Sequence, residues 1–392
     1  MYKDKVNGAV YFSSIGIRSR FLAIRLGELY RSEKGAMTES NWQPLEDWLY
    51  SLTPFYSYSH ADKSFARRLH DGLQGRGIRC WLDEHQMVPG QDIYAEPWAF
   101  DLHTGNSKTR SHPLTGEDSE WRFSRPGHHC GVITATPNMM FFRSGFIGYY
   151  DLYNDSGTRH FAGQRLGCWI NAIPGNGLVM IPEASAGCVC QFSIASTVVM
   201  EPKTDNKSWG IFSAVGPTTP VKRMGINFGA PGDRKDKSAR EWFGYPRPRI
   251  SGRLEFVFDV QPKIAAGGGW YSRNAESFEI LNTDTPWLYT SGARGLSQFE
   301  LPLLGADDPK SKYTVKLHFA ELNTDRSGMF DVRLQGTAVA QNVDIAAESG
   351  QHRANIKEFT DVTVDRNLLV ELVSHDKDAP ATLAAIEVIR QD

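Results

Sequence analysis

The strongest constraint on the fold is a run of alternating apolar and polar residues between positions 313 and 336. Its apolar positions are Tyr313, Val315, Leu317, Phe319, Phe330, Val332 and Leu334. A period of two is typical of a strand that buries one face and exposes the other. The polar stretch 323–328 separates the two halves and supplies turn-forming residues. The pattern predicts a β-hairpin, whose apolar face must be covered by further strands.

Three more segments with the same alternation supply such strands. They are Leu254, Phe256, Phe258 and Val260, then Leu368, Val370 and Leu372, and finally Ala384, Ile386 and Val388. The region 222–392 is therefore predicted to form an all-β sandwich with almost no helix.

Four blocks of this region resemble, in the same order, the malectin family. They are GINFGAPGDRKDKSAREWFGYPRP (225–248), YTVKLHFAEL, MFDVRLQG and the final AAIEVI. The resemblance implies a carbohydrate-binding β-sandwich, with an oligosaccharide or glycan as its partner.

Aromatic residues in the turn-rich segments of the sandwich are the candidate carbohydrate-binding residues, because flat rings stack on the apolar faces of sugars. The candidates are Tyr245, Trp270, Tyr271, Trp287 and Tyr289. For each one, packing in the core is an equal alternative. Trp242 lies within the family's opening motif and is expected in the core, and the nearby acids Asp233 and Asp236 are interpreted as solvated turn residues.

Residues 55–97 have a different pattern. A short β-rich run at 55–59 is followed by a predicted helix with Phe65, Leu69 and Leu73 on one face, and then by a second strand at 78–84. This βαβ unit resembles the first third of a TIR domain. The resemblance implies assembly with another TIR-domain protein, but the glutamate of TIR enzymes that cleave NAD has no matching position. Neither Glu84 nor Glu96 is assigned that role, so a truncated, inactive module is expected.

The region 98–203 is rich in short β-like runs, glycines and paired aromatics. The blocks LTGEDSEWRFSRPGHHCG, FFRSGFIGYYDL and GQRLGCWINAIPGNGLVMIPEASAGCVC resemble the closing blades of PQQ-type β-propellers. The region has room for two or three blades, too few to close a ring, and the family's cofactor is not predicted. Residues 204–221 are interpreted as a linker, with Ile211 and Phe212 as candidates to pack on the sandwich. Residues 1–54 remain unassigned.

Soft metal ligands are clustered in the propeller-like region. They are His128, His129, Cys130, Cys168, Cys188 and Cys190. Their spacing matches no zinc motif with recurring C-x-x-C pairs. Buried cysteines or a single disulfide are favoured alternatives, so no metal site is predicted.

Composition narrows the function classes. The net charge of −2, with both signs interspersed, argues against a nucleic-acid partner. No apolar run reaches the roughly 18 residues of a membrane span, and Arg18, Arg20 and Arg25 interrupt any signal-peptide core. The chain is therefore assigned to the cytoplasm by default.

The sequence contains no G-x-S-x-G, H-E-x-x-H or P-loop motif, so it carries no catalytic signature of these kinds. The leading interpretation is a mainly β, non-enzymatic, multi-module protein that binds carbohydrate through the malectin-like sandwich. The alternative is a TIR-type signalling or assembly protein with the β modules as its sensor. An enzymatic propeller is a third class, and it requires blades that this sequence lacks.

Overall fold

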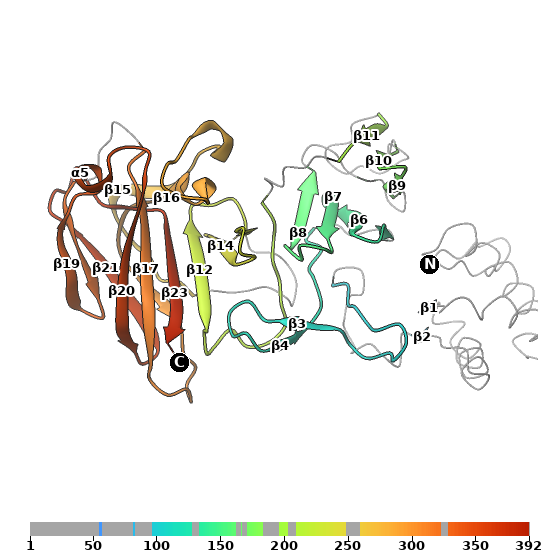
Figure 1. Ribbon diagram of the computed structural model, residues 1–392, viewed down its shortest axis with the longest axis horizontal. Coiled ribbons are helices and arrows are strands. Elements are labelled where there is room, and N and C mark those ends of the chain that lie inside the picture. Colours follow the sequence, from blue (N-terminus) through green and yellow to red (C-terminus); the bar gives the residue numbers. More distant parts are fainter. Residues whose placement is uncertain are drawn as a thin grey trace, which may run out of the picture.

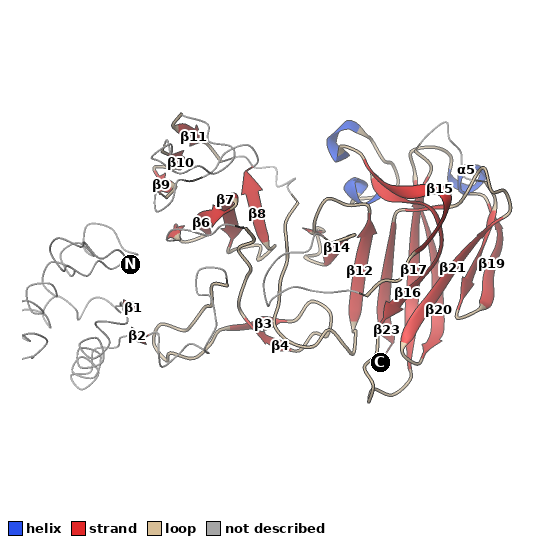
Figure 2. Ribbon diagram, turned by 180° about the vertical axis from the view of Figure 1, so that it is seen from behind, coloured by secondary structure: helices blue, strands red, loops and turns tan. Residues whose placement is uncertain are grey.

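The structure is a computed structural model. It describes residues 96–127, 133–161, 166, 171–182, 196–202, 209–247, 259–322 and 328–391, together with two short strands, β1 (Phe55–Tyr56) and β2 (Trp81–Leu82). Strands dominate these residues, as Figures 1 and 2 show. Helical structure within them is limited to α5 (Ile345–Ser349) and the 3-10 turns η2 (Ala275–Ser277) and η3 (Pro286–Tyr289). The predicted mainly β fold is confirmed.

The C-terminal part is a sandwich of two sheets. In spatial order, the first sheet contains β13 (Arg234–Lys235), β14 (Glu241–Tyr245), β12 (Arg223–Phe228), β23 (Ala385–Gln391), β17 (Ser311–Ala320) and β20 (Ala354–Val364). The second contains β15 (Lys263–Ser272), β16 (Ser291–Pro302), β21 (Asn367–Ser374), β18 (Phe330–Leu334) and β19 (Thr337–Val343), with β22 (Thr382–Leu383) paired to β16. The apolar core lies between these sheets.

The alternating residues face this core. Tyr313, Val315, Leu317 and Phe319 of β17 are fully buried, and so are the inward apolar residues of the other predicted strands: Phe330, Val332 and Leu334 of β18, Leu368, Val370 and Leu372 of β21, and Ile386 and Val388 of β23. The predicted inward faces are therefore confirmed. Of the upstream segment, Val260 is buried in the core, while residues 251–258 lie outside the described residues.

The predicted hairpin is wrong, because β17 and β18 belong to different sheets. Strand β17 pairs with β20 and β23, whereas β18 pairs with β19 and β21. Their apolar faces meet across the core, where the rings of Phe319 and Phe330 lie 5.5 Å apart. Alternation determines which face of a strand is buried, but it does not determine the strand's partner.

The middle region forms small antiparallel sheets. A ribbon of β3 (Thr109–Ser111) and β4 (Asp118–Glu120) precedes a four-stranded sheet of β5 (Thr134–Ala135), β6 (Met139–Ser144), β7 (Phe146–Asp151) and β8 (Thr158–Phe161). A third sheet contains β9 (Ile173–Gly175), β10 (Leu178–Ile181) and β11 (Val198–Met200). The four-stranded sheet runs up and down in chain order, as one propeller blade does. The propeller assignment itself stays a prediction.

Near the N-terminus, β1 and β2 are paired in parallel, with Phe55 opposite Trp81 and Tyr56 opposite Leu82. A parallel pair requires a crossover connection of a dozen or more residues, which residues 57–80 can supply. The predicted helix with Phe65, Leu69 and Leu73 lies outside the described residues, as do the six clustered histidines and cysteines.

Helices long and apolar enough to cross a membrane do not occur in the described part of the chain.

Candidate functional site

The segment around residues 209–213 joins the middle region to the sandwich through its main chain. Ile211 exchanges two backbone hydrogen bonds with Thr158 of β8, at 2.9 and 2.8 Å, and Gly210 exchanges two with Asp233, at 2.8 and 2.7 Å. Gly157 has a φ of +85° and approaches so closely that a Cβ would lie 2.6 Å from the carbonyl oxygen of Ile211. Glycine is therefore required there for this close approach.

Asp233 fixes the junction from the side of the sandwich. Its carboxylate is 2% exposed and forms a bidentate ion pair with Arg247, with N–O distances of 2.6 and 2.9 Å. It also accepts hydrogen bonds from the backbone amides of Phe212, at 2.7 Å, and Gly244, at 2.9 Å. The interpretation of Asp233 as a solvated turn residue is wrong, because four donors satisfy its buried charge.

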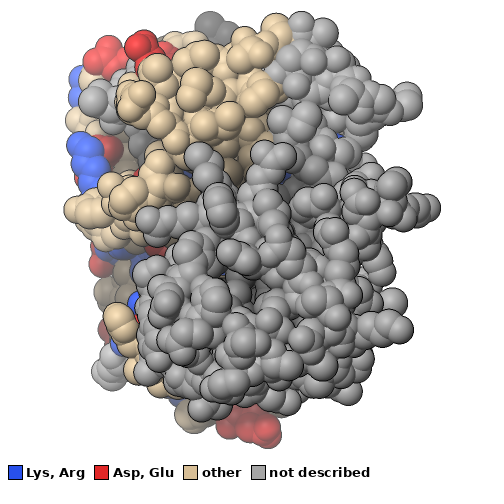
Figure 3. All heavy atoms as spheres, turned by 90° about the vertical axis from the view of Figure 1, so that its right-hand side faces the viewer, with Lys and Arg blue, Asp and Glu red and all other residues tan. Residues whose placement is uncertain are grey.

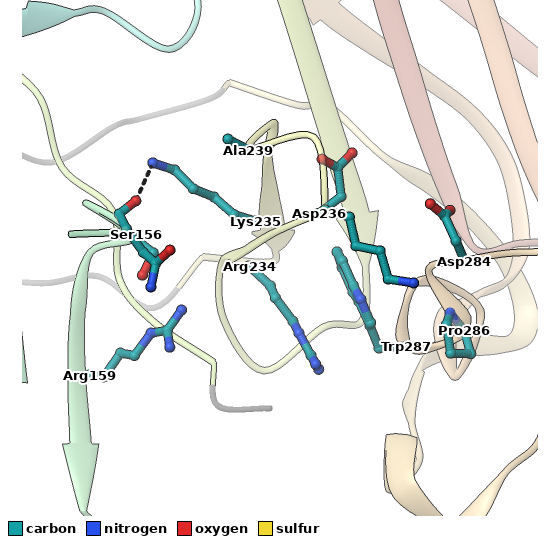
Figure 4. Close-up of a pocket in the computed structure, with 11 residues that line it drawn as sticks. Ser156, Arg159, Arg234, Lys235, Asp236, Ala239, Asp284, Pro286 and Trp287 are labelled. Atoms are coloured by element: carbon teal, nitrogen blue, oxygen red, sulfur yellow. Dashed lines mark hydrogen bonds between the residues drawn. The ribbon is translucent and has the colours of Figure 1, made fainter. Parts of the chain in front are cut away.

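A cleft of about 500 Å³ opens beside this junction, and Figure 4 shows its walls. We call it the junction cleft. Its described lining consists of Asn154, Ser156, Arg159, Arg234, Lys235, Asp236, Lys237, Ala239, Asp284, Pro286 and Trp287. The first three come from the middle region and the others from the sandwich. Ligand sites in proteins typically enclose about 300–1,000 Å³, so the cleft has the size of a binding site.

Arg234 on β13 is the central cation of the cleft. It is 8% exposed, and its guanidinium carbon lies 5.4 Å from the ring centroid of Trp209 and 4.9 Å from that of Trp287. Burial lowers the pKa of Arg234; nearby Glu276 opposes this shift, and Arg159 adds to it. The guanidinium remains charged because arginine ionises far above neutral pH. Its Nη1 has no hydrogen-bond partner among the described residues.

The neighbouring charged residues of β13 are held by other partners. Lys235 donates to the carbonyl oxygens of Asn154, at 2.9 Å, and Asp155, at 2.7 Å. Asp236 is 8% exposed and pairs with the Nε of Arg240 at 2.7 Å. In Figure 4 its carboxylate points away from Arg234. Asp236 is therefore not a solvated turn residue, and its charge is balanced outside the cleft.

The predicted aromatic residues are placed unequally. Trp287 lines the cleft at 7% exposure, with the guanidinium of Arg234 over its ring and Trp209 against it edge to face at 5.6 Å. Tyr289 is 1% exposed, and its hydroxyl is 2.9 Å from Nδ1 of His318. The structure therefore places Tyr289 in the core, where it offers no ring face to a ligand. Trp242, also buried, confirms the expectation of a core position.

Tyr245 and Trp270 lie together at a second place on the sandwich. Their rings are 5.4 Å apart, and Trp270 stacks on the buried ring of Phe228 at 5.9 Å. The Tyr245 hydroxyl donates to the carbonyl oxygen of Val260 at 3.0 Å. Tyr271 is half-buried and packs against the cluster that contains Trp287, and burial raises the pKa of its hydroxyl. Direct contact of these side chains with a sugar stays a prediction.

Sequence reasoning missed the cations of the cleft. Arg234 and Lys237 belong to the sequence GDRKDK, and its three basic residues could have indicated a cationic site. Arg159 and Trp209 offered no such signal, because only the junction brings them beside β13.

A second cavity, of about 380 Å³, lies on the other side of Lys235. It is lined by Glu241, which is 5% exposed and pairs across the β13–β14 ladder with Lys235. Neither carboxylate oxygen of Glu241 has a hydrogen-bond partner among the described residues. Burial raises the pKa of Glu241 to about 8. At neutral pH this residue is therefore a mainly protonated acid.

Comparisons with known proteins agree with two of the sequence resemblances. The malectin domain family matches residues 245–389, and the TIR domain family matches residues 55–98. The chain thus combines a TIR domain match near its start with a malectin domain in its sandwich. No curated protein matches the chain.

Solved structures that match part of the chain include the β-glucuronidase of Bacteroides uniformis, at 14% identity and a TM-score of 0.36, covering 68% of this chain and 28% of that chain. The ANX2 ectodomain from Arabidopsis thaliana has 13% identity and a TM-score of 0.31, covering 43% of this chain and 42% of that one. The complex of the plant peptide RALF23 with FER and LLG2 has 19% identity and a TM-score of 0.29, covering 43% and 40%. The chain spans less than half the length of each.

Proposed function

We propose that the protein binds carbohydrate through its malectin domain, without catalysis, and that the junction cleft is the binding site. The observation that carries the proposal is the composition of this cleft at the edge of the malectin domain. It brings the exposed polar side chains of Asp284 and Lys237 to one opening, beside the largely buried Trp287. Sugars require such polar side chains, because their hydroxyls need hydrogen-bond partners.

The test is a glycan array probed with the full chain, followed by titration of any ligand found. Open sugar sites typically bind with millimolar to micromolar dissociation constants, about 4–8 kcal/mol. Asp284→Ala and Lys237→Ala should each weaken binding about three- to tenfold, since each removes roughly one hydrogen bond. Both side chains are exposed, so the thermal melt should not change.

Lys310→Ala is the matched control. Lys310 is a surface residue that pairs with Asp365 at 3.1 Å and does not line the cleft. An array without any ligand for the wild-type protein would overturn the proposal. Binding that is lost in Trp270→Ala but unchanged in both cleft variants would move the site to the cluster of Tyr245 and Trp270.

A second candidate function is assembly through the TIR segment. The observation that favours it is the TIR match at residues 55–98, together with the parallel pairing of β1 with β2. The proposed partner is another TIR-domain protein. Light scattering of the full chain, alone and mixed with an isolated TIR domain, tests this proposal through a partner-dependent increase in mass.

NAD cleavage is not proposed for this segment. Glu96 is 6% exposed and forms an ion pair with Arg122 at 2.8 Å, so its carboxylate already has a structural partner. Incubation of the full chain with NAD should release no nicotinamide. Sustained turnover that disappears in Glu84→Ala or Glu96→Ala would contradict this expectation.

A further inference from the structure

The charge of the junction cleft differs from that of the whole protein. The chain has a formal net charge of −2, yet the described lining contains four cationic side chains and two acidic ones. One of the acids, Asp236, is paired with Arg240. On the face seen in Figure 3, by contrast, the described surface carries basic and acidic side chains together. The cleft is therefore a local positive site on a nearly neutral protein.

The guanidinium of Arg234 is held by packing. It lies against both Trp209 and Trp287, at 5.4 and 4.9 Å from their ring centroids, which limits its freedom to turn. Nη1 is buried without a hydrogen-bond partner among the described residues. An unsatisfied donor of this kind costs free energy, and an acceptor that enters the cleft would recover it.

A second guanidinium reaches the same space from the middle region. Arg159, on β8, is 3% exposed and lines the cleft together with Arg234. Burial lowers the pKa of Arg234; Glu276 opposes this shift, and the charge of Arg159 adds to it. In Figure 4, Arg159 lies on the β8 side of the cleft, and Arg234 extends from β13 toward Trp287. Both cations line the cleft, so a ligand that enters it can meet each of them.

We propose that the junction cleft binds an acidic carbohydrate, a uronate-bearing sugar whose carboxylate is bound by Arg234 and stabilised by Arg159. This inference rests on the proposed carbohydrate-binding function and specifies its ligand. The planar fork of a guanidinium matches a carboxylate with two parallel hydrogen bonds. Because Arg159 belongs to the middle region, the complete site requires both parts of the protein.

The remaining lining favours a sugar acid over a simple anion. Asp284 is an exposed acceptor on the cleft wall, suited to sugar hydroxyls, and it repels densely charged ligands such as nucleic acid. Lys237, also exposed, supplies a further donor at the rim.

The experiment is calorimetric titration of the full chain with matched sugars. Glucuronate and galacturonate are compared with glucose and galactose, which differ from them at one carbon, and acetate and inorganic phosphate serve as simple anions. The uronates should bind at least tenfold more tightly than their neutral counterparts, the effect of about one charge-assisted hydrogen bond. Raising the salt concentration should weaken the uronates only.

Two variants of the cleft test which side chains produce the preference for uronates. Arg234→Lys keeps the charge but loses the fork; it should reduce uronate affinity about tenfold and leave neutral sugars unchanged. Lys237→Glu reverses an exposed charge without disturbing the core, and it should weaken uronates about tenfold more than it weakens neutral sugars. Lys310→Glu is the charge-matched control away from the cleft. If uronates bind no more tightly than glucose and galactose, the inference is overturned while carbohydrate binding survives. Equal binding of acetate or phosphate also overturns it, in favour of an anion site without sugar specificity.

Discussion

The sandwich and the middle region are stabilised in different ways. The sandwich encloses one continuous apolar core between two large sheets. The described part of the middle region has two small apolar clusters and arginines, buried or partly buried, that lie against aromatic rings. Arg125 is over the ring of Phe142 at 5.1 Å, and Arg110 is over that of Phe212 at 4.6 Å. Apolar burial is non-directional, whereas buried charges depend on a specific set of partners.

The partners of Arg110 illustrate this dependence. Its guanidinium donates to Asp155 at 2.8 Å, to the hydroxyl of Tyr150 at 3.0 Å and to the carbonyl oxygen of Arg122 at 2.6 Å. We therefore expect the stability of the sandwich to depend mainly on the volume of its core side chains. The stability of the middle region and of the junction should depend mainly on the charged partners of their buried side chains.

The largest effect is expected in the core of the sandwich. Phe319→Ala should destabilise the protein by about 3–5 kcal/mol through the cavity it leaves, and Val332→Asp by at least as much through a buried unpaired carboxylate. Chemical denaturation followed by circular dichroism measures both. Lys316→Ala is the control, because Lys316 forms only a partly exposed pair with Glu358, at 3.2 Å, worth about 0–1 kcal/mol. If Lys316→Ala were the most damaging change, the described register of β17 would be contradicted.

The junction should be nearly as sensitive to the loss of a charge. Asp233→Ala leaves Arg247 and two backbone amides without their acceptor, which should cost about 3–5 kcal/mol. Limited proteolysis should then cleave the chain between the middle region and the sandwich, near residues 209–216. Asp236→Ala is a matched acid-to-alanine change at a buried acid whose partners, Arg240 and the amide of Ser238, lie within the sandwich, so it should not open the junction to the protease. Unchanged protease resistance in Asp233→Ala would show that the main-chain bonds alone hold the junction.

Glu241 provides a pH-dependent effect. Burial raises its pKa to about 8, from an ordinary value of 4.5; Asp233 adds to the shift, and Lys235 opposes it. Between these two pH values the folded protein retains a proton that the unfolded chain releases, so this contribution to stability falls as the pH rises. Glu241→Gln should match the wild type near pH 4.5 and melt at a higher temperature than the wild type at pH 8–9. Parallel pH profiles for the two proteins would exclude this role.

Sequence patterns predicted the buried faces of the sandwich but not all of its strand pairings. Alternation placed Tyr313 and Phe319 in the core, because inward and outward positions follow directly from the pleat of a strand. The same pattern gave β17 the wrong partner, since two strands with matching apolar faces can lie side by side or face each other across a sandwich. The proposed domain boundaries are not tested by these features and stay predictions.

The candidate site was less accessible to sequence reasoning. Trp287 was identified from its residue type and its turn-rich surroundings, but the face expected to bind sugar is covered by Arg234. Asp233 stood next to glycine and basic residues and so resembled a solvated turn, while its partners Arg247 and Phe212 become neighbours only through folding. Local composition cannot report a charge that is satisfied by distant groups.

The attachment of the segment 209–213 has a consequence for how such a protein can diverge. Its four hydrogen bonds to Thr158 and Asp233 use only main-chain groups. Most side-chain substitutions along the segment should therefore leave these hydrogen bonds intact. Glycine is required at positions 157, 210 and 232, because a Cβ there would lie within 3 Å of a neighbouring carbonyl oxygen. Descendants of this chain can therefore exchange most side chains of this segment while they inherit the same main-chain attachment between the two modules.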